Sequence, residues 1–77
     1  MLMPLSELAV GHRAEVRRVL CGPELARRLE DLGLTPGLEV RLLHRAPAGS
    51  PCAYDIRGAA IALRKKDAGD ILVEERS

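Results

Sequence analysis

Aromatic side chains are nearly absent from this sequence of 77 residues, which contains no phenylalanine, no tryptophan and one tyrosine, Tyr54. Leucine, valine, isoleucine and alanine must therefore build the core, and little ring surface is left on which a nucleotide base stacks. A chain of this length holds one hydrophobic core, so we expect one domain spanning residues 1–77. A small RNA-binding barrel is an alternative that the shortage of aromatic rings disfavours.

An excess of charge of one sign is also lacking. Twelve lysine and arginine residues stand against 11 aspartate and glutamate residues, for a net charge of +1. Proteins that bind nucleic acid through phosphate contacts usually carry a marked basic excess, so we expect no nucleic-acid partner. No apolar run approaches the roughly 18 residues of a membrane-spanning helix, and the first residues lack the pattern of a secretory signal. We therefore expect a cytoplasmic protein without direct membrane insertion.

Soft metal ligands are few: Cys21, Cys52, His12 and His44 are the whole set. The cysteines form no CxxC pair, and reduced thiols are the default in the cytoplasm. His12 and Cys21 fall at opposite ends of one expected strand, whereas a hairpin that pairs His44 near Tyr54 brings His44 within reach of Cys52. Structural zinc takes four ligands, so we expect no cofactor and no metal site within one chain. The alternative is a transition metal that His and Cys residues of two copies hold in a homodimer.

A catalytic constellation is also missing from the sequence. Neither histidine is spaced for pairing with a nucleophile, and no glycine-rich segment is suited to cradle a phosphate. Glu30 and Asp31 are adjacent on an expected helix surface and do not form an acid–base pair. We expect no catalytic residues, and hence not an enzyme.

Glycine and proline divide the chain into short segments. Segments 12–20, 38–46 and 52–57 alternate as strands do, and 59–64 and 71–73 are predicted as two further strands. In the first of them we expect a bulge or an edge position at Arg18 and an inward-facing Leu20. Short helical turns are predicted at Pro4–Leu8 and Lys65–Gly69, and a frayed tail at Glu75–Ser77. Five short strands with one early helix predict an all-β protein, a small antiparallel barrel.

The early helix has the strongest local signals. Pro23 suits the first helical position, and Gly33 suits a left-handed residue just beyond the end. Leu25, Leu29 and Leu32 recur at helical spacing. We interpret this stripe as core that closes one end of the barrel, in preference to a partner-binding surface.

Three stretches together resemble the FeoA family: RRLEDLGLTPG (Arg27–Gly37), APAGSP (Ala46–Pro51) and RGAAIALRKKDAGDILV (Arg57–Val73). Each motif is common by itself, but their order and spacing are specific. The resemblance implies an SH3-like barrel of about five strands with one short helix after the first strand. It also implies an accessory module of bacterial ferrous iron uptake, which binds the cytoplasmic GTPase-bearing part of a FeoB-type transporter. A direct metal-binding carrier is the alternative.

A surface for such a partner is predicted at the Pro47–Pro51 loop. Two prolines that bracket Gly49 hold an exposed loop in few conformations, which lowers the ordering cost of binding. Arginines expected beside the loop supply charge-assisted contacts, and a pair on the helix is the next candidate. The alternative is that the prolines only stiffen the end of a hairpin. The candidate partner-binding residues are Arg45, Pro47, Gly49, Pro51, Arg57, Arg27 and Arg28.

Overall fold

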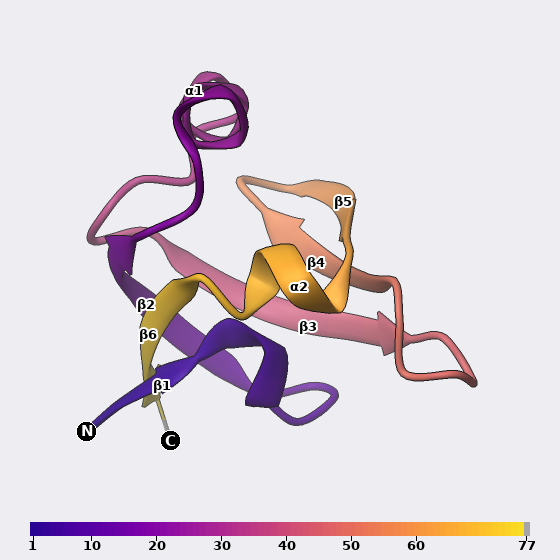
Figure 1. The fold of residues 1–77 in the computed structure, drawn as a ribbon. Helices are drawn as coiled ribbons and strands as arrows, with labels where there is room; N and C mark the ends of the chain where they lie inside the picture. Colours follow the sequence, from indigo (N-terminus) through magenta and orange to yellow (C-terminus); the bar gives the residue numbers. More distant parts are fainter. Residues whose placement is uncertain (77) are drawn as a thin grey trace.

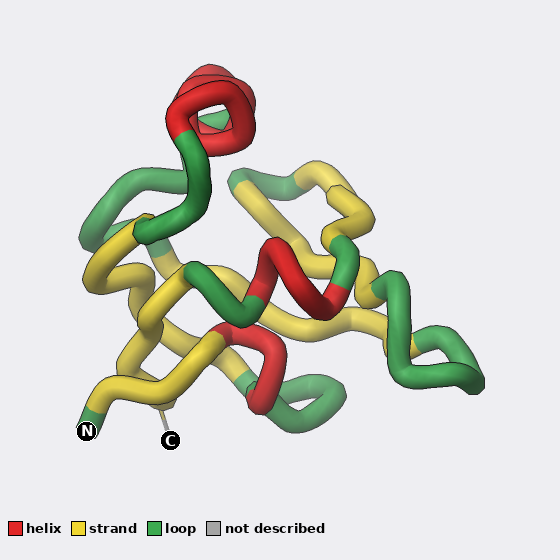
Figure 2. The backbone as a smooth tube through the Cα atoms, viewed as in Figure 1, coloured by secondary structure: helices red, strands yellow, loops and turns green. Residues whose placement is uncertain are grey.

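Six antiparallel strands form one sheet in the order β1-β6-β2-β3-β4-β5 in a computed structural model that describes residues 1–76 (Figure 1). The elements along the chain are β1 (Leu2–Pro4), the 3-10 helix η1 (Leu5–Glu7), β2 (Arg13–Val19), α1 (Pro23–Asp31), β3 (Glu39–Arg45), β4 (Cys52–Ile56), β5 (Ala59–Leu63), α2 (Lys65–Ala68) and β6 (Ile71–Arg76). The sheet curls into an open barrel that leaves β1 and β5 as its two edges. Figure 2 shows α1 set apart from the barrel and joined to it by loops. The predicted all-β antiparallel barrel is thus confirmed, with six strands in place of about five.

The additional strand is β1, which pairs with β6 from Leu2 opposite Glu74 to Pro4 opposite Leu72. Three residues are too few to show alternation, so only the pairing identifies this strand. The frayed tail predicted at Glu75–Ser77 is also wrong for Glu75 and Arg76. β6 continues through Glu75 and Arg76, which pair with β2, and Ser77 lies outside the described residues.

One aliphatic core fills the barrel, and the fully buried Tyr54 is its only aromatic member. Most of the buried side chains come from the inner faces of β2, β3, β4 and β6, as alternation along those strands predicts, and β5 adds Leu63. η1 and α1 add further buried leucines. The side chains that are less than 2% exposed and largest in volume are Tyr54, Leu5, Leu8, Leu29, Leu34, Leu42, Ile56, Ile71, Val16, Val40 and Val73.

The end of β2 departs from strict alternation. The pairing of β2 with β6 shifts between Val16 and Arg18, which confirms the irregularity predicted at Arg18. Beyond this shift Val19 packs against the core, whereas Leu20 is 52% exposed. The prediction of an inward Leu20 was wrong because the bulge changes which residues face the core.

Helix α1 begins at Pro23 and ends as its sequence predicts. Gly33 has a φ of +93°, its N–H donates to the Glu30 carbonyl, and the Leu34 N–H donates to the Leu29 carbonyl. These are the two hydrogen bonds of a Schellman motif. The core stripe is narrower than predicted, because Leu29 is buried but Leu32 is 43% exposed. Leu32 caps the helix where the chain leaves it, and so does not turn toward the barrel.

Candidate functional site

The Pro47–Pro51 loop joins β3 to β4 and is held by its own hydrogen bonds. The Gly49 N–H donates to the Ala46 carbonyl at 2.7 Å, with Pro47 at the position of this turn that favours proline. The Ala46 N–H donates to the Pro51 carbonyl at 3.1 Å, and the Lys65 N–H donates to the Ser50 hydroxyl at 3.0 Å. Pro47 and Pro51 are exposed. The loop thus combines an exposed tip with an anchored base, as a preorganised binding loop requires.

Arg45, predicted as a contact residue beside this loop, is half-buried and holds the fold together. One guanidinium nitrogen of Arg45 donates to the Leu8 carbonyl at 2.7 Å, and the other lies 3.5 Å from the Ser6 carbonyl. The hydroxyl of Tyr54 donates to the Leu5 carbonyl at 3.4 Å. The β3–β4 hairpin therefore supplies side-chain donors to carbonyls of η1 and of Leu8, the residue that follows it.

Arg57 was expected to flank the same loop, and the structure corrects this placement. Arg57 lies beyond the opposite end of β4, in the two-residue turn to β5, with a φ of +53°. Its side chain passes over Gly33, so closely that a Cβ at Gly33 would overlap it. A cation at this position is close to the C-terminus of α1, where it interacts favourably with the helix dipole.

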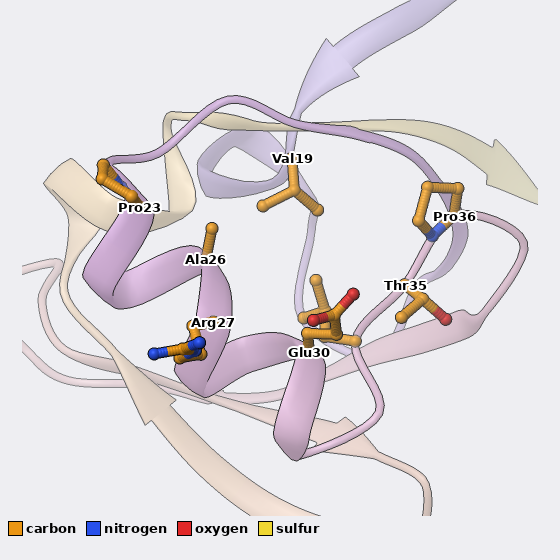
Figure 3. Close-up of a pocket in the computed structure, with 8 residues that line it drawn as sticks. Val19, Pro23, Ala26, Arg27, Glu30, Thr35 and Pro36 are labelled. Carbon is orange, nitrogen blue, oxygen red and sulfur yellow. The ribbon is translucent and has the colours of Figure 1, made fainter.

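A groove separates α1 from the end of β2 and has a volume of about 320 Å³. Figure 3 shows Ala26, Arg27 and Glu30 from α1 on one side, with Val19 and Pro36 opposite. Arg27, one of the two helix arginines predicted as the next candidates for partner contact, therefore lies at the rim of a partly apolar groove. Sequence reasoning missed this groove because its lining comes from three separate segments, none of which carries a recognisable motif.

The four soft metal ligands do not come together. A register shift in β3 between Leu42 and His44 pairs His44 with Ala53, next to Tyr54 as expected, but His44 is exposed whereas Cys52 faces the core. Cys52 is buried, with its Sγ 3.5 Å from the Gly49 carbonyl. His12 pairs with Glu75, its Nδ1 lying 2.6 Å from Oε2. Among residues 1–76, no three His, Cys, Asp or Glu side chains are grouped so as to hold one ion.

Burial shifts the pKa values of Tyr54 and Cys21. Burial raises the pKa of Tyr54 to about 12, reinforced by Cys52 and opposed by the nearby Arg45 cation. Burial also raises the pKa of the Cys21 thiol, and the carboxylates of Asp70 and Asp67 add to this effect. Both shifts favour the neutral form, which is the state of a packed residue and not of an activated nucleophile.

No helix in residues 1–76 is both long and apolar enough to cross a membrane. The arrangement as a whole offers surface for contacts: an anchored loop at one end of the sheet and grooves beside α1 at the other.

Comparison with known proteins identifies the family. A FeoA protein from Chlorobium tepidum is 40% identical, with a TM-score of 0.93 over 97% of this chain and 71% of its own. The zinc-complexed FeoA of Stenotrophomonas maltophilia, described as a prokaryotic SH3 domain protein, is 34% identical with a TM-score of 0.78, covering 94% of this chain and 89% of its own. The likeness confirms the predicted SH3-like fold.

A longer relative also matches, the Fe(2+) transport protein A/Fe(2+) transporter FeoB fusion protein of Porphyromonas gingivalis. It is 33% identical over 72 residues, which are 94% of this chain but 8% of the relative. The FeoA domain family itself matches residues 3–75. With nearly the whole chain matched and the SH3-like fold shared, this protein belongs to the FeoA domain family, which is associated with ferrous iron transport.

Proposed function

We propose that this protein is a cytoplasmic binding module, not an enzyme, that binds the GTPase-bearing part of a FeoB-type transporter and modulates ferrous iron transport. The observation that carries the proposal is the Porphyromonas gingivalis fusion protein, in which a segment similar to this chain shares one polypeptide with a FeoB transporter. Fusion raises the effective concentration of one module at the other, which is an advantage when the two modules bind each other.

The Pro47–Pro51 loop remains the first candidate for the contact. Its tip is exposed and its base is held by hydrogen bonds to Ala46 and from Lys65, so little conformational entropy is lost on binding. Binding residues usually collect in such loops on a rigid scaffold. Arg45 contributes by anchoring the neighbouring hairpin, and it is therefore unsuitable for a variant that must leave the fold intact.

Capture of the purified protein by the immobilised GTPase-bearing part of the transporter tests the proposal. Replacing Pro47 and Pro51 together by alanine should weaken capture, whereas Pro36→Ala, on the groove beside α1, is the matched control. Loss of capture only in Pro36→Ala, or in an Arg27→Ala Arg28→Ala variant, would move the contact to α1. Failure of the unaltered protein to be captured would remove the transporter as partner.

Metal binding between two copies is a second candidate, favoured by the zinc complex of the Stenotrophomonas maltophilia relative. In this chain His12 and Glu75 place two metal-ligating atoms side by side on an exposed surface, and a second copy would complete four ligands. Sedimentation with Zn²⁺ and with a chelator tests this. A zinc-dependent dimer that His12→Gln abolishes and His44→Gln leaves intact supports it, and a monomer under all conditions contradicts it.

A further inference from the structure

Strand β5 forms one edge of the sheet, and it lacks the features that usually protect an edge. Its residues, Ala59–Leu63, include no charge and no proline, and its pairing with β4 runs without a bulge. Edge strands normally carry lysine, proline or a bulge that prevents another strand from adding. The opposite edge, β1, is only three residues long and ends in Pro4. An approaching strand therefore has one suitable edge, and it is β5.

The turn before β5 determines which of its backbone groups face outward. Arg57 and Gly58 both have positive φ, as in a two-residue type I′ turn, which makes Ile56 and Ala59 a hydrogen-bonded pair. Pairs alternate along an antiparallel ladder, so the backbone N–H and C=O groups of Ala60 and Ala62 point away from β4. Within residues 1–76, neither alanine makes a backbone hydrogen bond to a segment outside the sheet. Both side chains are exposed and small, so they leave the edge open to another backbone.

A groove of about 220 Å³ runs between this edge and α1. Its apolar lining comes from Leu25 and Leu29 of α1, from Leu32 at the helix C-cap, and from Ile61, Ala62 and Leu63 of β5. In Figure 1 both elements lie in the upper part of the view, with α1 above the β4–β5 hairpin. A strand added to β5 lies about 4.8 Å from it, and alternate side chains of that strand meet one face of the groove. The exposed Leu32, which the core does not use, would then gain an apolar contact.

The charges around the groove indicate the chemistry of the occupant. Arg64 is paired with Asp67, the nitrogen and oxygen lying 3.6 Å apart, whereas no ion pair to Arg28 or Arg57 is found in residues 1–76. These two cations flank the edge on the α1 side, so they attract carboxylates.

The charges at the two ends of β5 also disfavour a second copy of this chain as the occupant. When two β5 strands pair antiparallel so that Ala60 of each copy meets Ala62 of the other, Arg57 falls opposite Lys65, and like charges face each other.

We propose that β5 is a docking edge for an extended segment of a partner protein that turns small apolar residues at alternate positions toward α1 and carries an acidic residue on the same face near each end. The segment adds to the sheet as a further strand, and its backbone bonds to Ala60 and Ala62. Its apolar side chains lie against the leucines of α1, and its carboxylates meet Arg28 and Arg57. This site is separate from the Pro47–Pro51 loop and does not depend on the transporter being the partner.

A nitrogen-15-labelled sample titrated with the synthetic peptide ETVTVTE, whose two glutamates and two valines share one face of the strand, tests the proposal by NMR. The amides of Ala60 and Ala62 should exchange rapidly in the free protein, then shift and become protected as the peptide is added. The same peptide with lysine in place of glutamate should bind at least about tenfold more weakly. No binding of the glutamate peptide, equal binding of both peptides, or shifts centred elsewhere would overturn the proposal.

Variants of the edge complete the test. Ala60→Pro removes an outward donor without breaking the β4 ladder, and it should weaken binding by about tenfold or more. Ala60→Thr keeps that donor and is the matched control. Should Ala60→Pro not fold, Ala62→Glu replaces it, because an exposed carboxylate there repels the peptide. Unchanged affinity in a folded variant would exclude the edge, and concentration-dependent broadening at Ala60 and Ala62 without peptide would assign it to a second copy.

Discussion

Tyr54 couples the stability of this protein to alkaline pH. Its side chain is 0% exposed, and its hydroxyl donates to the Leu5 carbonyl. Ionisation would remove that donor and leave a charge in an aliphatic core, which is why burial raises its pKa from 10.0 to about 12. The unfolded chain ionises near the ordinary value. The stability from neutral Tyr54 is therefore fully present below pH 10 and is lost as the pH rises toward 12.

The size of the effect follows from the shift. Two pKa units at about 1.36 kcal/mol each correspond to about 2.7 kcal/mol. A small domain is stabilised by about 5–15 kcal/mol in total, so this loss is a substantial fraction. The denaturant concentration at the midpoint of unfolding should therefore decrease as the pH is raised from 10 to 12. The Tyr54→Phe variant should lose less stability over this pH interval, because it has no tyrosine to ionise and only its other groups titrate there.

The composition of the chain makes the measurement direct. Tyr54 is the only tyrosine and there is no tryptophan, so the tyrosinate absorbance reports this residue alone. Circular dichroism followed in the same samples separates ionisation from unfolding. We expect tyrosinate to appear above pH 10, together with or after the loss of folded signal. Tyrosinate that forms near pH 10 in a protein that stays folded would refute the buried placement of Tyr54.

Four further predictions concern stability and thiol reactivity. Leu29→Ala should lower the free energy of unfolding by about 2–5 kcal/mol because it leaves a cavity in the core. Gly33→Ala should lower it by about 1–2 kcal/mol because residue 33 has a positive φ. A larger loss for Gly33→Ala than for Leu29→Ala in denaturant unfolding would contradict the core assignment. Arg45→Met should cost about 1.5–3 kcal/mol in the same melts, because it leaves η1 carbonyls without a charged donor. Alkylation of Cys21 at neutral pH should be slower than that of a free thiol and faster in Asp70→Asn, since that carboxylate raises the thiol pKa; an unchanged rate would argue against the carboxylate. A strong chelator should leave the thermal unfolding curve unchanged, and collapse of the fold on chelation would reveal a structural metal.

Local chemistry determined several elements that the sequence predicted without further information. The end of α1 follows from Gly33, since glycine adopts the left-handed conformation of a Schellman motif at little steric cost. Strand β4 alternates without interruption, with Cys52, Tyr54 and Ile56 buried. In each case the information lies within a few residues, because capping and alternation depend only on near neighbours. The family resemblance rested on the order and spacing of three local motifs, one of which, Arg27–Gly37, contains this helix end.

Contacts between distant segments decided the rest, including most of the candidate site. Arg45 and Arg57 looked equivalent in the sequence, yet Arg45 is anchored to carbonyls of η1 and Arg57 lies over the end of α1. The residues next to Arg45 and Arg57 in the sequence do not indicate this difference. Likewise, the sequence predicted that Ala60 and Ala62 lie in a strand but not that the strand is an edge. Strand order is a property of the whole fold, so only the tertiary structure shows that these two alanines have β4 on one side and no strand on the other.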